Sequence, residues 1–195
     1  MIRSGESVAG IVLAAGESTR TLLERILDEA LRSDLDEVIL VLGHLFEDIR
    51  AVLGQVLEHP KLKVIQNRQY KQGISSSIIA GLSEVEESHD HVMILLADMP
   101  HIDANLIDLL VRRYIDSRLP LGAIKLKTKR THPVIFSRKL NTEKPLKRDE
   151  CCTCLGLLPF VLKNRNIHCP EHFVELWTGN CFLIQQYRTD RSVGL

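Results

Sequence analysis

Short runs of apolar residues alternate along the first two thirds of the chain with segments in which apolar residues recur at helical spacing. Continuous apolar runs are typical of strands that are buried on both faces of a sheet. They occur at Val8 to Ala14, Glu37 to Leu42 and His91 to Ala97, and a further short strand is predicted at Lys61 to Gln66. A helical segment follows each run, which predicts a parallel sheet with helices covering both of its faces.

Polar residues mark the beginnings of the predicted helices. Thr21 and Glu24 have the spacing of a capping box, and the apolar residues from Leu22 to Leu31 share one helical face. The other predicted helices are Phe46 to Leu57, one opened by the serines Ser75, Ser76 and Ser77, and one capped by Asp103 that continues through Tyr114.

The last third of the chain is less regular. Strands are predicted at Leu121 to Leu126, Pro133 to Ser137, Phe173 to Trp177 and Asn180 to Ile184. The basic turn Lys127 to Arg130 separates the first two, and the lysine-rich segment Lys139 to Asp149 is predicted as a loop. Because no repeat or long linker divides the chain, we predict a single domain over residues 1–195. Its fold class is α/β, with three α/β/α layers and a mostly parallel, twisted, Rossmann-like sheet.

Composition indicates a globular protein and gives no sign of a polyanionic partner. The chain has 195 residues, of which 45% are hydrophobic and 26% charged, and this is enough for a core without disulfides. Lys and Arg together number 25, as do Asp and Glu, so no overall field favours nucleic acid or an anionic membrane. No apolar run approaches the roughly 20 residues of a membrane span. Four of the five cysteines lie between Cys151 and Cys169, which favours a reducing cytoplasm over a disulfide framework.

The candidate functional residues follow the ends of two predicted strands. The strand that ends at Ala14 runs into Ala15 and Gly16, a glycine turn whose backbone N–H groups, together with Arg20, suit phosphate binding. Asp98 follows the strand His91 to Ala97, at the end where open α/β sheets place their ligands. A buried, unpaired carboxylate would be costly, so we expect a cation to face Asp98. A phosphate cradle and a metal-binding carboxylate together predict a nucleotide enzyme.

Four sequence motifs occur in the order seen in the MobA-like nucleotidyltransferases. They are Leu13 to Arg20, Gln72 to Ser77 followed by Ala80-Gly81-Leu82, Leu96 to Pro100, and His132 to Phe136. On these motifs the chain resembles that family, and most closely its branch of molybdenum-cofactor cytidylyl- and guanylyltransferases. The opening motif alone is shared by many sugar and cofactor nucleotidyltransferases, whereas the four in order are specific.

The resemblance implies a Rossmann-like nucleotidyltransferase fold and a set of roles. It implies that a loop comprising Leu13, Ala14, Ala15 and Gly16 wraps the triphosphate of CTP or GTP. Arg20 would neutralise phosphate charge, and Asp98 would hold Mg²⁺ at the α-phosphate. Gly73 and the serines Ser75, Ser76 and Ser77 would line the site. A terminal phosphate of molybdopterin would then attack the nucleotide and release pyrophosphate.

The chain departs from the family pattern at three places. The family's arginine is followed by Met-Gly, a lysine and a glycine-containing turn, whereas Arg20 is followed at once by a helix-like segment. Where the family usually has an Asp-Ile-Asp stretch, the chain reads Phe182-Leu183-Ile184-Gln185-Gln186, with no acidic residue until Asp190. Thr131 stands where the family has glycine before His-Pro. These losses favour a non-catalytic nucleotide-binding domain as one alternative. A sugar-phosphate or other cofactor nucleotidyltransferase is another.

Simpler interpretations compete at several residues. The role of the three serines could be limited to capping the helix, without any contact to substrate. His132 could be a structural residue or could contact substrate. Lys127, Lys129 and Arg130 are better explained as a solvated turn than as a nucleic-acid patch. The residues Cys151, Cys154, His168 and Cys169 have no ordinary four-ligand zinc spacing, so we predict reduced, metal-free cysteines.

Overall fold

A computed structural model describes residues 5–14, 20–44, 46–85, 87–126, 129–138 and 181–185. For residues 20, 125–126, 129–131 and 181–185 it describes the backbone alone. Its strands are β1 (Val8–Ala14), β2 (Glu37–Leu42), β3 (Leu62–Gln66), β4 (His91–Leu96), β5 (Leu121–Leu126), β6 (Lys129–Ser137) and β7 (Cys181–Gln185). Its helices are α1 (Arg20–Arg32), α2 (Phe46–Leu53), α3 (Ile74–Val85) and α4 (Ala104–Ser117), with short 3₁₀ helices η1 (Gly54–Glu58) and η2 (Tyr70–Gln72).

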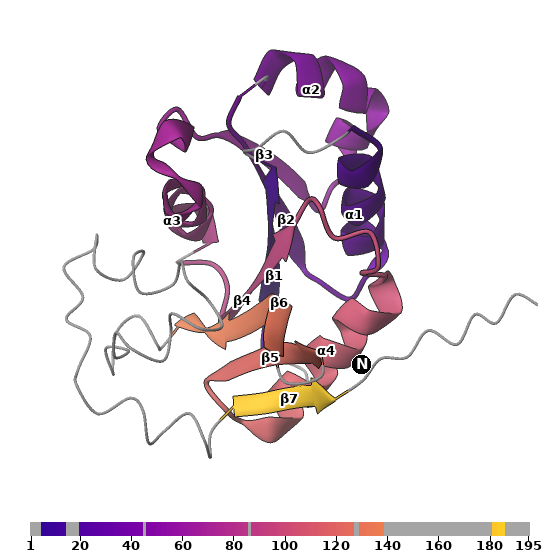
Figure 1. Cartoon of the computed structure of the whole chain (residues 1–195), viewed down its shortest axis with the longest axis vertical. Coiled ribbons are helices and arrows are strands. Elements are labelled where there is room, and N and C mark those ends of the chain that lie inside the picture. Colours follow the sequence, from indigo (N-terminus) through magenta and orange to yellow (C-terminus); the bar gives the residue numbers. More distant parts are fainter. Residues whose placement is uncertain are drawn as a thin grey trace, which may run out of the picture.

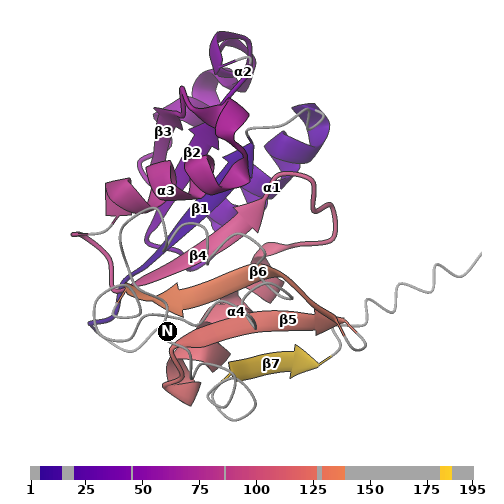
Figure 2. The same ribbon diagram turned by 60° about the vertical axis from the view of Figure 1, so that its left-hand side comes forward.

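All the strands in the described part of the chain join one sheet, in the order β3-β2-β1-β4-β6-β5-β7 (Figures 1 and 2). The first four strands run parallel to one another, as predicted from the apolar runs. β6 is antiparallel to both β4 and β5, and β7 is parallel to β5. The chain therefore adds strands on one side of β1 and then crosses to its other side, so the strand order reverses between β1 and β4.

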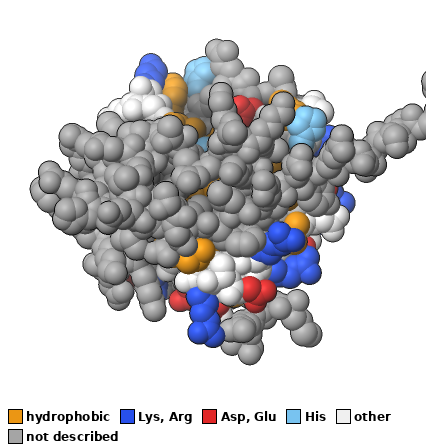
Figure 3. Space-filling view, turned by 60° about the horizontal axis from the view of Figure 1, so that its bottom comes forward, with side chains coloured by type: hydrophobic (Ala, Val, Ile, Leu, Met, Phe, Trp, Pro, Cys, Tyr) orange, Lys and Arg blue, Asp and Glu red, His pale blue; other side chains and the backbone are white. Residues whose placement is uncertain are grey.

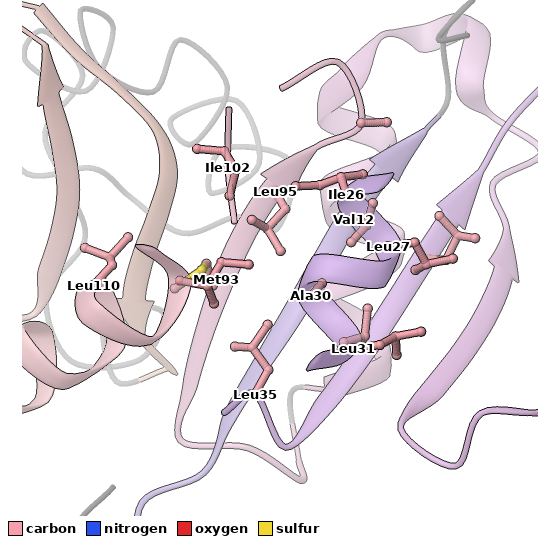
Figure 4. Close-up of a cluster of buried hydrophobic side chains, with 14 of the residues drawn as sticks. Val12, Ile26, Leu27, Ala30, Leu31, Leu35, Met93, Leu95, Ile102 and Leu110 are labelled. Atoms are coloured by element: carbon pink, nitrogen blue, oxygen red, sulfur yellow. The ribbon is translucent and has the colours of Figure 1, made fainter. Parts of the chain in front are cut away.

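Helices cover both faces of the sheet, which confirms the predicted three layers. In Figure 1, α3 lies on one side of the strands, and α1 and α4 lie on the other. Successive residues of a strand point to opposite faces. Within β1, Val12 belongs to the cluster with α1 and α4, while Ile11 and Leu13 belong to the cluster with α3. Figure 4 shows the first cluster, where Leu27 of α1 and Leu110 of α4 flank strand residues such as Met93.

Helix α3 packs unusually close to the sheet at Gly81. A Cβ atom added there would lie 2.6 Å from Ile11 Cγ2 and 3.2 Å from Val41 Cγ2. Both neighbours are buried strand residues, with exposed fractions of 0%. The absence of a side chain at Gly81 thus sets the distance between α3 and the strands that carry the candidate site.

We expect the Gly81→Val variant to lose about 2 kcal/mol of unfolding free energy, because overpacked core positions must displace their neighbours. Urea denaturation followed by circular dichroism measures the loss. Gly81→Ala should lose less, since alanine gains about 1 kcal/mol over glycine in helix propensity. A valine variant as stable as wild type would contradict the close packing of α3.

Several predicted boundaries are wrong, each for a local reason. The helix predicted from Phe46 to Leu57 ends at Leu53, because Gly54 has a φ of 48° and the chain continues as η1. Thr21 lies inside α1, since that helix already begins at Arg20. The predicted basic turn is shorter, because Lys129 and Arg130 pair with Leu126 and Lys125 of β5 and therefore belong to β6.

The serines predicted to open the third helix lie inside it, because α3 already begins at Ile74. The strand predicted from Pro133 begins earlier, at Lys129.

Other predictions are confirmed or fall outside the described residues. Asp103 caps α4, and its Oδ1 accepts a hydrogen bond from Leu106 N at 2.8 Å. The last predicted strand is found as β7, shifted by one residue. Outside the described residues lie the loop Lys139 to Asp149, the strand Phe173 to Trp177, and the segment with Cys151, Cys154, His168 and Cys169.

The surface of the described residues mixes both signs of charge. On the face shown in Figure 3, Lys or Arg side chains lie beside Asp or Glu side chains, so the described part of this face has no large patch of one sign. Among the described helices, none has the length and apolar character needed to span a membrane.

Candidate functional site

The carboxyl ends of β1 and β4 meet at the point where the strand order reverses. Leu13 pairs with Leu96 in the parallel register, and Ala97 N donates a hydrogen bond to Leu13 O at 3.1 Å. Ligands of open α/β sheets bind at such reversal points, outside the carboxyl ends of the strands. The two loops that the sequence singles out, after Ala14 and after Ala97, therefore leave the sheet from adjacent strands.

The predicted phosphate loop starts at this edge. Leu13 and Ala14 are buried, with exposed fractions of 5% and 2%, so only their backbone can serve a ligand. Ala15 and Gly16 lie outside the described residues. Arg20 is the first residue of α1. No glycine-containing turn separates it from the helix, which is the departure seen in the sequence.

Asp98 is exposed, which contradicts the expectation that its carboxylate is buried and needs a cation for that reason. The preceding residue, Ala97, is 1% exposed, so burial ends abruptly at Asp98. Water can solvate the carboxylate, and the burial penalty that motivated the expectation does not apply. The position of Asp98 at the reversal point, and not desolvation, is what makes it a candidate ligand.

One carboxylate can serve a magnesium ion only if the substrate provides further ligands. Among the described residues, no three His, Cys, Asp or Glu side chains gather closely enough to hold a metal by themselves. Mg²⁺ prefers oxygen ligands, retains waters, and is commonly bound by one or two carboxylates plus substrate phosphates. An exposed aspartate beside a predicted triphosphate loop fits that kind of site.

His132 of β6 lies close to Asp98. Since Ile94 pairs with Val134 in the antiparallel register, His132 lies further towards the carboxyl end of β4. Burial lowers the pKa of the His132 imidazole, and the negative charge of Asp98 acts in the opposite direction. Burial has the larger effect, so the pKa of the ring lies below its usual range and the neutral form is favoured. His132 thus adds a polar group to this edge without adding a positive charge.

Glu29, which the sequence reasoning missed, connects the helices that follow the two loops. Its Oε2 accepts a hydrogen bond from Ala104 N, the first residue of α4, at 2.8 Å. Its Oε1 accepts one from Arg32 at 2.6 Å. Glu29 lies on α1, which follows the phosphate loop, whereas α4 follows the Asp98 loop. A carboxylate at a helix N-terminus is favourable there, and this one holds the two helices together.

The predicted serines occupy different environments. Ser75 and Ser77 are 5% and 0% exposed, while Ser76 is half-buried. Ser77 therefore offers no surface to a ligand, and its effect on a ligand would be indirect. Gly73, just before α3, has a φ of 100°, a backbone conformation that favours glycine. Gly73 and Ser76 remain the parts of this motif that a ligand can reach.

Asn67, at the end of β3, is a second residue that the sequence reasoning missed. It is 5% exposed and donates through Nδ2 to Ser76 Oγ at 2.8 Å and to Ser77 Oγ at 2.9 Å. An asparagine directly after a strand, followed by a glycine-terminated turn, is a typical signal for a side chain that organises the loop. That signal was available in the sequence.

An aromatic pair lies beside this segment. The rings of His44, which follows β2, and Tyr70 of η2 stack with centroids 5.7 Å apart and planes inclined by 28°. The Tyr70 hydroxyl and His44 Nδ1 are 3.3 Å apart and form a hydrogen bond. Both residues come from loops at the carboxyl end of the sheet. The pair fixes the position of η2 relative to the end of β2.

Comparison with known proteins defines the class. The family model described as MobA-like NTP transferase domain matches residues 10–148, which include all four motifs, most of β1 and the strands β2 to β6. The chain belongs to the MobA-like NTP transferase domain family. Its Rossmann-like sheet is the fold expected for a nucleotidyltransferase.

Individual relatives are more distant. The bifunctional protein GlmU of Symbiobacterium thermophilum is 26% identical over 125 residues, which cover 56% of this chain and 26% of that protein. The chain thus spans about a quarter of the length of this curated relative. Rv0371c of Mycobacterium tuberculosis H37Rv is 25% identical, with a TM-score of 0.56, over 70% of this chain and 74% of that one. Another structure of Rv0371c is a complex with manganese.

A further solved structure has a similar fold. The 4-diphosphocytidyl-2C-methyl-D-erythritol synthase of Anaerococcus prevotii has a TM-score of 0.66 and covers 95% of this chain and 90% of its own. The sequences are 14% identical, so this likeness concerns the fold and not the substrate.

Proposed function

We propose that this chain is an Mg²⁺-dependent nucleotidyltransferase that transfers CMP from CTP, or GMP from GTP, to a molybdopterin-type cofactor. The observation that carries the proposal is the meeting of β1 and β4 at the reversal of strand order. There, exposed Asp98 lies beside the strand end that begins the Leu13 to Arg20 motif. Family membership supports nucleotidyl transfer as the general reaction.

The proposed reaction is a displacement at the α-phosphorus of the nucleoside triphosphate. A phosphate oxygen of the acceptor forms the new P–O bond, and the bond to the pyrophosphate leaving group breaks. Such reactions depend mainly on positioning and charge neutralisation. Backbone N–H groups of Ala15 and Gly16 and the guanidinium of Arg20 would bind the triphosphate. Asp98 would hold Mg²⁺, whose positive charge offsets the phosphate charge that accumulates during transfer.

The metal and the location are also proposals. The manganese complex of Rv0371c supports a divalent cation in a related protein, and the single exposed carboxylate of Asp98 suits Mg²⁺ shared with phosphates. We assign the chain to the cytoplasm because its odd number of cysteines suits a reducing compartment. Its balanced charge argues against nucleic acid as a partner.

Two other functions have specific support. The opening motif from Leu13 to Arg20, which many sugar and cofactor nucleotidyltransferases share, keeps a sugar-phosphate or other cofactor acceptor in consideration. The start of α1 at Arg20, with no lysine-bearing turn, favours a domain that binds nucleotide without catalysis. The absence of an acidic residue after β7 until Asp190 points in the same direction.

Nucleotide titration followed by a turnover assay separates these functions. We expect calorimetry to show Mg²⁺-dependent binding of CTP or GTP in preference to ATP and UTP. Pyrophosphate release should then require molybdopterin. Pyrophosphate release with a sugar 1-phosphate, and not with molybdopterin, would show that the acceptor is a sugar phosphate. Nucleotide binding without turnover on either acceptor would support the non-catalytic domain. Failure to bind any of the four nucleotides would overturn the proposal.

A further inference from the structure

Asn67 joins the carboxyl ends of β2 and β3 to the first turn of α3. Its backbone N–H donates to Leu42 O at 2.8 Å, at the last residue of β2. Leu42 is the register partner of Ala14, where the phosphate loop begins. Asn67 is therefore attached to the same edge of the sheet as the proposed triphosphate site, and β2 lies between β3 and β1.

The hydrogen bonds of the Asn67 side chain fix its orientation. Gln69 N lies 2.9 Å from Oδ1, and a backbone N–H can only donate, so the oxygen of the amide must face Gln69. The amide nitrogen then faces the serines, and its two hydrogens go to Ser76 Oγ and Ser77 Oγ. The buried amide has a partner for both hydrogens and for its oxygen, and its side chain is 5% exposed. The polar side-chain atoms of Asn67 are thus all hydrogen-bonded within the protein and are not available to a ligand.

The network continues from Asn67 to Gly73. Ser76 Oγ lies 2.8 Å from Gly73 O and 3.0 Å from Gln69 O, and its single hydrogen can be donated to either carbonyl. Gly73 N in turn donates to Tyr70 O at 3.1 Å, and Gln72 N donates to Gln69 O at 2.8 Å. One buried side chain therefore fixes the whole turn from Asn67 to the start of α3.

We propose that Asn67 is a positioning residue of the nucleotide site, which holds Gly73 and Ser76 in the arrangement that receives the nucleoside triphosphate. This inference rests on the proposed function, because it assigns a purpose to the Gly73 to Ser77 motif of that site. Asn67 acts through Ser76 and the Gly73 backbone, since its own polar atoms are occupied. Without its amide, Ser77 Oγ would lose its hydrogen-bond donor in a fully buried position.

A double-mutant cycle on nucleotide affinity tests the proposal. In the full-length chain with Mg²⁺, Asn67→Ala should raise the Kd for CTP or GTP about tenfold, and Ser76→Ala should raise it by a similar factor, the scale of one or two net hydrogen bonds. The Kd of the double variant should also rise only about tenfold, because the effects of substitutions within one hydrogen-bond network are not additive. Independent roles would instead give the product of the two losses, about 100-fold, and would overturn the proposal.

A control separates positioning from general stability. Asp90 precedes β4 at the opposite edge of the sheet and accepts hydrogen bonds from Ser7 N at 3.1 Å and Ser7 Oγ at 3.2 Å. Asp90→Ala removes comparable side-chain hydrogen bonds between two chain segments, far from the proposed site. The Kd for nucleotide should therefore stay within about twofold of the wild-type value. An equal loss of affinity in Asp90→Ala and Asn67→Ala would assign the effect to stability and overturn the positioning role.

The outcomes for the proposed function and for Asn67 differ. Wild-type protein that binds no nucleotide would overturn both. Wild-type binding with an unchanged Kd in Asn67→Ala would overturn only the role of Asn67. Hydrogen exchange without ligand gives a second readout, because the Gln69 and Gly73 amides should exchange faster in Asn67→Ala. If that variant does not fold, Ser76→Ala is tested instead, and an unchanged Kd there would overturn the proposal.

Discussion

Replacing Asp98 with asparagine is expected to lower pyrophosphate release at least about 100-fold, the scale of a lost electrostatic contact in the transition state. Asparagine keeps the shape of the side chain but removes the negative charge that would hold Mg²⁺. Because Asp98 is exposed, the change leaves no buried group unsatisfied. The fold should therefore be unaffected, with a circular dichroism spectrum and melting temperature close to those of wild type.

Asp116, an exposed acid on α4, provides the matched control. Asp116→Asn removes the same charge away from the proposed site and should retain wild-type turnover. Turnover is measured as pyrophosphate release with the nucleotide and acceptor that the wild type accepts. An Asp98→Asn variant with undiminished turnover would remove Asp98 from the mechanism. A wild-type chain that binds nucleotide without turnover would favour the non-catalytic domain.

Replacing Arg20 with alanine is expected to weaken binding of CTP or GTP by about 1.5–3 kcal/mol, the value of a hydrogen bond to a charged group. Arg20 begins α1, directly after the loop that would wrap the triphosphate. A helix N-terminus already favours anions, and the guanidinium would add a full charge. Calorimetry on the purified variant measures the loss.

Arg25 on the same helix is exposed and serves as the control. Arg25→Ala removes an equal charge about one turn further along α1, where the effect of the helix terminus has faded. Its nucleotide affinity should remain close to that of wild type. Equal losses in the two variants would indicate a general electrostatic effect and not a phosphate contact at Arg20.

The parallel half of the fold could be predicted because its signal is local. Strands buried on both faces require uninterrupted apolar runs, and β1 is buried at each of its positions. The end of α2 was missed because helical periodicity continues through Gly54, while the positive φ of that glycine ends the helix. Sequence periodicity reports which face of a segment is apolar, and it does not report the backbone angle at one residue.

The candidate site was predictable in outline and not in detail. The apolar runs located the strand ends at Ala14 and Ala97, but the reversal of strand order between β1 and β4 was seen only in the structure. The exposure of Asp98 depends on where the next loop turns. Glu29 was missed because its partner Ala104 belongs to another element of the chain. Asn67 carried a local signal, since it directly follows a strand and precedes a turn that ends in glycine, and that signal was overlooked. The burial of Ser77 could have been predicted from the sequence. Ser77 and Gly81 are four residues apart and therefore share the helix face that packs on the sheet.

The reversal of strand order between β1 and β4 has a consequence for folding. β1 and β4 are distant in the sequence and adjacent in the sheet, so the two loops meet only after the chain has completed β2, β3 and the crossover through α3. No early fragment of the chain contains both halves of the proposed site. A ligand held between them would bind only the assembled sheet, and its binding energy would therefore add to the stability of the whole cooperative unit.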